Sequence, residues 1–220
     1  TRRFQLVLIK PSHYDDDGYV IQWMRAFVPS NTLAVLYSLG RDSALRGVLG
    51  PDTAIDITVI DEIHTRVKIN QLLALFRRHG GFGLLALVGV QSNQYPRALD
   101  IARPFRAAGV PVMVGGFHVS GCLAMLPEMQ ADLKKTLDMG VSMFAGELEG
   151  RTDRILQDAA NGTLQPIYNY LKDLPSLESE PTPILPVEHL RKTFQALASF
   201  DAGRGCPYQC SFCTIINVQG

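Results

Sequence analysis

A regular alternation of short apolar runs with helical patterns, between residues 55 and 160, constrains the fold more than any other feature of the sequence. Buried strands are predicted where the runs are apolar, at 55–60, 84–90, 110–114 and 141–145. Helices are predicted after these strands, at about 67–79, 96–108, 131–139 and 152–160. Short apolar strands that alternate with helices are typical of a parallel sheet covered on both faces.

The residues before this alternation extend the same pattern. Residues 4–10 form a mostly apolar run that predicts a first buried strand, and a polar loop follows it. Helices are predicted at 19–27, at 30–39 with an end at Gly40, and at 42–49. Residues 30–39 are also rich enough in Val and Tyr to form a strand instead. Five strands predict an α/β fold with a doubly wound, flavodoxin-like sheet in the order 2-1-3-4-5.

Polar or glycine-rich loops follow all five predicted strands. These loops are 13–18, 61–64, 91–94, 115–118 and 146–149. In doubly wound parallel sheets, ligands bind outside the carboxyl ends of the strands. One edge of the predicted domain is therefore expected to form a ligand site.

The composition changes after residue 162. Residues 1–162 are predicted to form the parallel α/β domain, whereas five prolines interrupt 163–192, which is predicted to be an extended linker. Residues 193–220 are predicted to open a second domain, with a strand at 194–200 that leads into a cysteine-rich loop. We expect the chain to contain only this first strand and loop of the second domain.

Three of the four cysteines, Cys206, Cys210 and Cys213, fall within eight residues in the spacing C-x3-C-x2-C. Three thiolates on one loop can bind three irons of a [4Fe–4S] cluster and leave the fourth iron open. Zinc is the main alternative, but structural zinc sites usually have four ligands, and no fourth cysteine or histidine is near in sequence. Ferredoxins use another spacing, with a fourth cysteine close by. The remaining cysteine, Cys122, is predicted to be a small buried hydrophobic residue.

The cysteine loop, with Gly205, Pro207 and Phe212 beside the cysteines, resembles the cluster loop of radical S-adenosylmethionine enzymes. The resemblance implies that the open iron binds the amino and carboxylate groups of S-adenosylmethionine, with Phe212 near the adenine. It also implies an electron donor such as flavodoxin or ferredoxin. Reductive cleavage of S-adenosylmethionine would give a 5′-deoxyadenosyl radical, which abstracts a hydrogen atom from a small-molecule substrate.

The α/β domain in front of this loop resembles the cobalamin-binding domain of cobalamin-dependent radical S-adenosylmethionine enzymes. Gly115 and Gly116 match the paired glycines after the fourth strand, where the absence of a side chain lets the backbone approach a ligand. Gly146 and Glu147 match the acidic glycine turn after the fifth strand, and Ser92 matches a serine of the family. The resemblance implies that these residues contact cobalamin, and that methylcobalamin delivers a methyl group to the substrate radical.

The first polar loop departs from the pattern D-x-H-x-x-G of cobalamin domains that bind cobalt through a histidine. His13 has no aspartate two residues before it, and Gly18 comes five residues later. Cobalamin is therefore expected to bind without a protein histidine ligand. His118, which follows the paired glycines, either contacts the ligand or faces solvent in a loop.

Other polar residues near the strand ends have structural explanations. Glu147 and Glu149 either bind a ligand or cap the following helix, where acidic side chains are favourable. His64 is predicted to be a polar cap at a strand end. His79 and His189 are predicted to lie at the surface.

Charge and composition exclude several kinds of partner. The chain has 21 basic and 21 acidic side chains, so no net field favours nucleic acid or an anionic membrane. With 46% hydrophobic and 19% charged residues it is typical of globular proteins, without an apolar run that could span a bilayer and without a signal peptide. An oxygen-sensitive cluster indicates a reducing, cytoplasmic location.

Two functions from different classes agree with these patterns. The first is a radical S-adenosylmethionine enzyme, with cobalamin-dependent methyl transfer as an extension; the chain would be its N-terminal part and inactive alone. The second is a module that binds cobalamin or a nucleotide-like ligand without catalysis. A complete barrel after the cysteine loop would distinguish the enzyme from the module.

Overall fold

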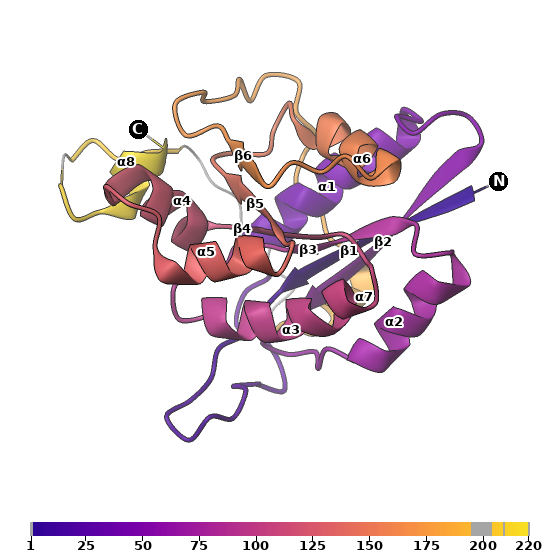
Figure 1. The fold of residues 1–220 in the computed structure, drawn as a ribbon, viewed down its shortest axis with the longest axis horizontal. Helices are drawn as coiled ribbons and strands as arrows, with labels where there is room; N and C mark the ends of the chain where they lie inside the picture. The colour runs from indigo at the N-terminus through magenta and orange to yellow at the C-terminus, as the bar shows by residue number, and fades with distance from the viewer. Residues whose placement is uncertain (1, 195–203, 209, 220) are drawn as a thin grey trace.

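The computed structural model describes residues 2–194, 204–208 and 210–219, which form a six-stranded parallel sheet flanked by helices (Figure 1). The strand order is β2-β1-β3-β4-β5-β6. The strands are β1 (Arg2–Lys10), β2 (Thr53–Asp61), β3 (Gly83–Leu87), β4 (Val112–Gly115), β5 (Ser142–Ala145) and β6 (Ile167–Asn169). The predicted α/β class and the order of the first five strands are confirmed.

Helices cover both faces of the sheet. Below the sheet in Figure 1 lie α2 (Ile69–Arg78), α3 (Tyr95–Ala107) and α5 (Ala131–Asp138), and above it lie α1 (Asn31–Leu45) and α6 (Thr152–Asn161). Successive side chains of a strand point to opposite faces. Leu85 and Leu87 therefore join the core under α2 and α3, whereas Leu84 and Ala86 join the core under α1 and α6.

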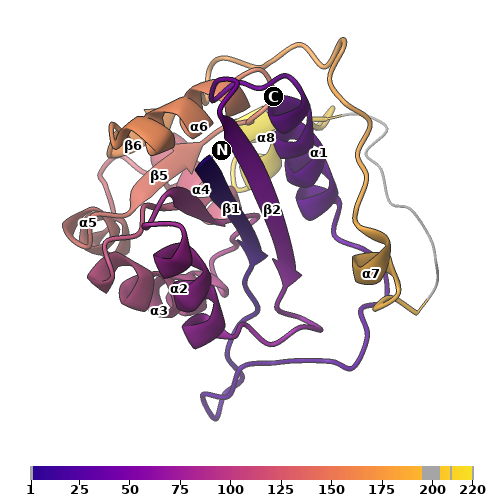
Figure 2. The same cartoon turned by 90° about the vertical axis from the view of Figure 1, so that its right-hand side faces the viewer.

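Three further helices lie at the carboxyl ends of the strands or beyond them. These are α4 (Phe117–Met125), α7 (Val187–Leu190) and α8 (Thr214–Gln219). Helix α8 packs against α4, at the left in Figure 1. Helix α7 lies beside the segment that follows β1, as Figure 2 shows, and the backbone N–H of Ala26 in that segment donates a hydrogen bond to the carbonyl of Lys192.

The predicted sheet has five strands, one fewer than the structure, which adds β6. β6 lies within 163–192, where the sequence predicts only a linker, and it pairs in parallel with β5. It is three residues long and directly follows Pro166, so its sequence has no strand-like run. Tyr168 anchors it, because its side chain is buried and its hydroxyl donates a 2.6 Å hydrogen bond to Asp158 of α6.

Glycine accounts for one helix prediction that is wrong and for one helix that the sequence does not predict. The sequence predicts that a first helix ends at Gly40, but residues 31–45 form one continuous helix. Gly40 is needed for packing rather than for termination, since a Cβ there would lie 2.9 Å from Leu6 Cδ2. The sequence does not predict α4, which begins directly after Gly116 with no intervening loop residue.

The predicted helix at 19–27 is also wrong. The chain there follows a turn in which the Asp15 carboxylate accepts backbone hydrogen bonds from Asp17 and Tyr19. Later in this segment, backbone N–H groups donate to carbonyls of other loops instead of forming helical hydrogen bonds. The N–H of Trp23, for example, donates to the carbonyl of Ile63. The predicted strand at 194–200 lies, apart from its first residue, outside the described residues.

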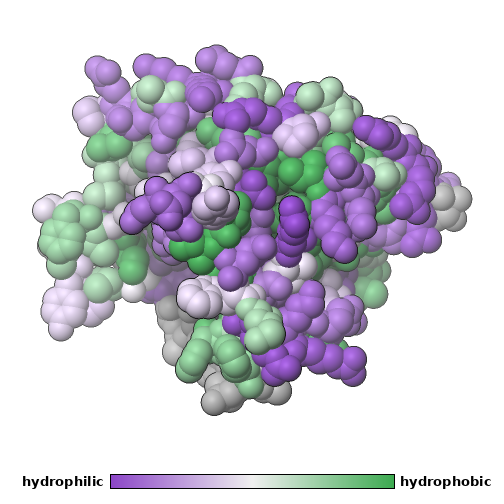
Figure 3. Space-filling view, turned by 90° about the horizontal axis from the view of Figure 1, so that it is seen from below, coloured by the Kyte–Doolittle hydropathy of each residue, from purple (hydrophilic) through white to green (hydrophobic). Residues whose placement is uncertain are grey.

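Segment 19–28 exposes several large apolar side chains, with Met24 90% and Phe27 77% exposed. The face seen from below in Figure 3 carries green apolar residues at its lower edge, among purple polar ones. Within the described ranges, every helix is too short or too polar to cross a membrane.

Candidate functional site

A cavity of about 540 Å³ lies between the sheet and helices α1 and α6, at the carboxyl ends of the central strands. Apolar side chains such as Leu84 and Met113 line it, together with Gly115, Gly116 and Gly146. This is the place at which doubly wound sheets bind ligands. Its size falls in the range of small-molecule sites, roughly 300–1,000 Å³.

The two paired glycines at the cavity have different roles. Gly116 has a φ of 140°, and a Cβ there would lie 2.2 Å from the backbone N of Val90, so the fold itself requires glycine. At Gly115 the nearest atom to a Cβ would be the carbonyl oxygen of Phe144, at 3.3 Å. The strand-to-helix turn therefore explains Gly116, whereas at Gly115 a Cβ would be in a tight but less severe contact.

Glu147, which also lines the cavity, binds the segment that carries the cysteines. Arg204 donates hydrogen bonds to the carboxylates of both Glu147 and Glu149, and Gln219 donates to Glu147 at 2.7 Å. The Glu149 side chain is only 5% exposed and that of Arg204 is 21% exposed, so these are shielded, charge-assisted hydrogen bonds. They hold Arg204, two residues before Cys206, at the cavity.

The cysteine motif is positioned by α8. Cys206, Cys210 and Cys213 are free and half-buried, and the N–H of Cys213 donates to the carbonyl of Cys210 at 3.0 Å just before α8 begins. Gly121 of α4 lets α8 approach, since a Cβ there would lie 2.8 Å from Thr214 Cγ2. Three thiols on one partly accessible loop are the donor set that a [4Fe–4S] cluster with one open iron requires.

Cys122 differs from these three cysteines. It lies on α4 and packs against the core beneath α3 and α5. Burial, and then the nearby Asp132 carboxylate, raise the pKa of its thiol. The predicted burial of Cys122 is only partly confirmed, because its side chain packs against the core but stays partly exposed.

Ser92 and His118 bind each other and do not line the cavity. Ser92 Oγ lies 3.1 Å from His118 Nδ1, and His118 Nε2 lies 2.8 Å from a carboxylate oxygen of Asp132. Phe212, beside the cysteines, is 84% exposed. Cofactor contacts of these three residues remain predictions.

Sequence reasoning missed Arg204 and Gln219 as parts of the site. Arg204 lies 57 residues from Glu147 in sequence, so no local pattern reveals that they meet. The available signal was a pair of acids after the fifth predicted strand and one arginine beside the cysteines. Opposite charges at two predicted ligand loops would have suggested the contact.

Comparison with known proteins gives one distant similarity. No protein-family model and no solved structure matches the chain. The chain is 30% identical over 145 residues to bacteriochlorophyllide d C-8(2)-methyltransferase of Chlorobaculum tepidum, a match that covers 61% of this chain and 29% of that protein. The chain thus spans less than a third of the length of a methyltransferase to which it is distantly similar.

Proposed function

We propose that the chain forms the N-terminal region of a radical S-adenosylmethionine enzyme that methylates a small organic substrate. The observation that carries the proposal is the position of Arg204, two residues before Cys206, at the cavity, where Glu147 and Glu149 accept its hydrogen bonds. Two cofactor sites of one reaction must lie close together, and this contact joins the two candidate sites. The distant similarity to a methyltransferase supports methyl transfer as the outcome.

In this proposal Cys206, Cys210 and Cys213 hold a [4Fe–4S] cluster, whose open iron takes S-adenosylmethionine. When bound, the cluster supplies the electron that cleaves S-adenosylmethionine to methionine and a 5′-deoxyadenosyl radical. Phe212 is exposed and therefore available to lie against the adenine. The electron would come from a donor such as flavodoxin or ferredoxin.

The cavity is the proposed site for the nucleotide tail of cobalamin. Its apolar lining suits a flat heteroaromatic base, and Gly115 offers backbone without a side chain at its edge. A whole corrinoid is larger than the cavity, so the corrin ring would lie outside it, toward the cysteine motif. The protein would then orient both cofactors, with no histidine from the loop after β1 as a cobalt ligand.

Anaerobic reconstitution of the 220-residue chain with ferrous iron and sulfide tests the cluster. We expect about four irons per chain and, after reduction, an electron paramagnetic resonance signal that changes when S-adenosylmethionine is added. Serine at Cys206, Cys210 or Cys213 should abolish this signal, whereas Cys122→Ser, the matched control, should keep it. A signal that survives all three single replacements would contradict the proposed ligands.

The cavity by itself also favours the second function, a module that binds a ligand without catalysis. The same reconstitution separates the two functions when hydroxocobalamin is present and corrin absorbance is measured after gel filtration. Corrin retained by a chain that takes up no cluster would favour the module. Cluster without corrin would keep the radical chemistry and remove cobalamin.

A further inference from the structure

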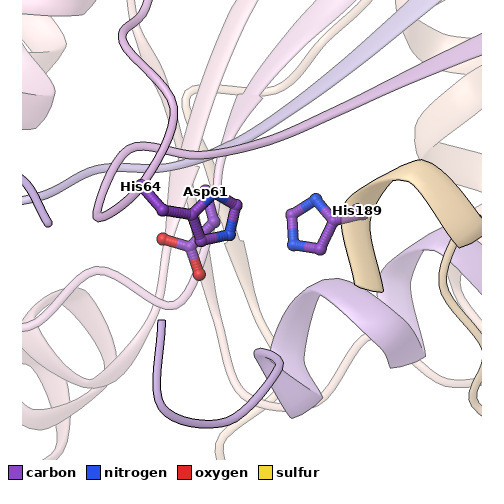
Figure 4. Close-up of side chains that lie close together, drawn as sticks. All are labelled: Asp61, His64 and His189. Atoms are coloured by element: carbon purple, nitrogen blue, oxygen red, sulfur yellow. The ribbon is translucent and has the colours of Figure 1, made fainter. Parts of the chain in front are cut away.

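A second group of potential ligands lies where α7 meets the loop after β2. Asp61 ends β2, His64 follows it in the loop, and His189 belongs to α7. One ligand atom from each of the three side chains lies within 4.8 Å of the other two. Figure 4 shows His189 pointing from α7 toward the His64 ring and the Asp61 carboxylate.

The burial of this group is unexpected from the sequence. His189, which the sequence predicts at the surface, is 6% exposed, and Asp61 is 2% exposed. Among the described residues, the buried Nε2 atoms of His64 and His189 have no hydrogen-bond partner. Buried side-chain nitrogens without a partner are rare in folded proteins, and each one needs an explanation. Two such atoms facing one carboxylate point to a shared cation.

We propose that Asp61, His64 and His189 bind one divalent transition-metal ion, with Zn²⁺ the best suited. Two imidazole nitrogens and one carboxylate oxygen form a common zinc donor set, with water at the remaining position. Ca²⁺ and Mg²⁺ are disfavoured, because they prefer sites made of oxygen ligands. Nothing in the proposed radical chemistry requires this ion, so the two proposals are independent.

The surroundings orient two of the three ligands as metal sites require. His64 Nδ1 lies 2.9 Å from Thr65 Oγ1, which leaves Nε2 for the metal. The Asp61 carboxylate accepts a 3.1 Å hydrogen bond from the backbone N–H of Ile63. Hydrogen bonds of this kind to metal ligands fix their orientation and raise their basicity.

Two lysine side chains near the proposed site would repel a bound cation. Lys10 Nζ lies 3.7 Å from the Asp61 carboxylate, and Lys192 Nζ donates to Thr65 Oγ1 at 2.9 Å. The Lys10 side chain is 30% exposed, so it has solvent into which it can move when a metal takes the carboxylate.

A metal here would fasten the segment that leads to the cysteine motif. His189 lies five residues before the end of the described range 2–194, and this segment already pairs with the loop after β1 through Ala26 and Thr193. The ion would add a bond from this segment to the loop after β2. The ion would therefore hold α7 against the α/β domain while water keeps one coordination position open.

The test uses the 220-residue chain with serine at Cys206, Cys210 and Cys213, so that these thiolates cannot bind metal. Titration with Zn²⁺ against a chromophoric chelator should give about one ion per chain. His64→Ala and His189→Ala should each weaken binding by at least about a hundredfold. His79→Ala, the matched control, replaces a histidine outside the group and should leave binding unchanged. No zinc uptake, or full uptake by both alanine variants, would overturn the proposal.

A second variant keeps the proposal testable if an alanine variant fails to fold. His189→Cys in the same background places a thiolate at the proposed ligand position. With Co²⁺ as the probe, it should show a thiolate-to-cobalt charge-transfer band that the parent lacks. A folded His189→Cys chain that binds Co²⁺ without this band would show that residue 189 is not a ligand.

Discussion

The two faces of the sheet differ in how completely helices fill them. Neighbouring residues of β3, Leu85 and Leu84, show the contrast: Leu85 belongs to the core under α2, α3 and α5, whereas Leu84 lines the cavity under α1 and α6. Both side chains are buried and chemically identical. Apolar patterning therefore builds both faces. Of two cavities among the described residues, the larger, about 540 Å³, lies under α1 and α6 at the carboxyl ends of the strands, and one of about 370 Å³ lies beside α2.

This difference separates core residues, which stabilise the fold, from cavity residues, which could contact a ligand. On the filled face, three helices and the start of α4 cover the strands. On the other face, α1, α6 and Arg204 line the cavity, together with Gly115 and Glu147. Substitutions on the filled face should cost stability, and substitutions at the cavity should cost binding.

Phe105→Ala should have the largest effect on stability. Its ring is fully buried on the filled face and makes an edge contact with Phe76, with ring centroids 6.0 Å apart. We expect a loss of about 3–5 kcal/mol. Met113→Ala on the cavity face should cost only about 2 kcal/mol, because part of its surroundings is already empty. Urea unfolding measures both, and equal losses would contradict the difference between the faces.

Gly116→Ala should have the second-largest effect on stability. The positive φ and the 2.2 Å approach to Val90 make any side chain there strained, so we expect a loss of roughly 3 kcal/mol. Gly115→Ala should cost less, about 1 kcal/mol, because its φ needs no glycine and the carbonyl oxygen of Phe144, 3.3 Å from a Cβ, would have to shift by only a few tenths of an ångström. Thermal unfolding compares the two. A fully stable Gly116→Ala chain would mean that the turn tolerates a side chain and that its glycine serves the ligand.

The smallest effects concern the contacts between helices on each face. On the filled face, the buried hydroxyls of Tyr95 in α3 and Thr136 in α5 lie 2.5 Å apart, and Tyr95→Phe should cost about 1 kcal/mol. On the cavity face, Arg46 binds Asp153 of α6 at 2.6 Å with both side chains more than a third exposed. Solvent screens this pair, so Asp153→Asn should cost well under about 1 kcal/mol.

The second of these contacts should also depend on pH. Hydrogen bonds from Arg46, and then from Ser43, hold the pKa of Asp153 below its usual range. The folded state therefore favours the ionised carboxylate, and its contribution is complete at neutral pH and lost as the pH falls from about 4 through the lowered pKa. Unfolding curves of wild type and Asp153→Asn should converge in acid. A difference that persists there would assign the effect to packing.

The sequence predicts what depends on local pattern and misses what depends on contacts between distant segments. The first five strands and the cysteine motif have clear local signals. β6 has none, because three residues after Pro166 gain their strand geometry only by pairing with β5. His189 looks like a surface residue until α7 packs on the loop after β2, and Arg204 has no visible partner until the chain brings it to Glu147.

Binding of hydroxocobalamin to matched tryptophan variants of α1 tests most directly whether the incompletely filled face is the ligand site. Val35 lines the cavity, and Val35→Trp would fill it, whereas Arg41 is exposed on the same helix. We predict that the wild type and Arg41→Trp retain corrin absorbance after gel filtration and that Val35→Trp, with an unchanged circular dichroism spectrum, does not. Equal retention by folded Val35→Trp would show that the cavity is not where the cofactor binds.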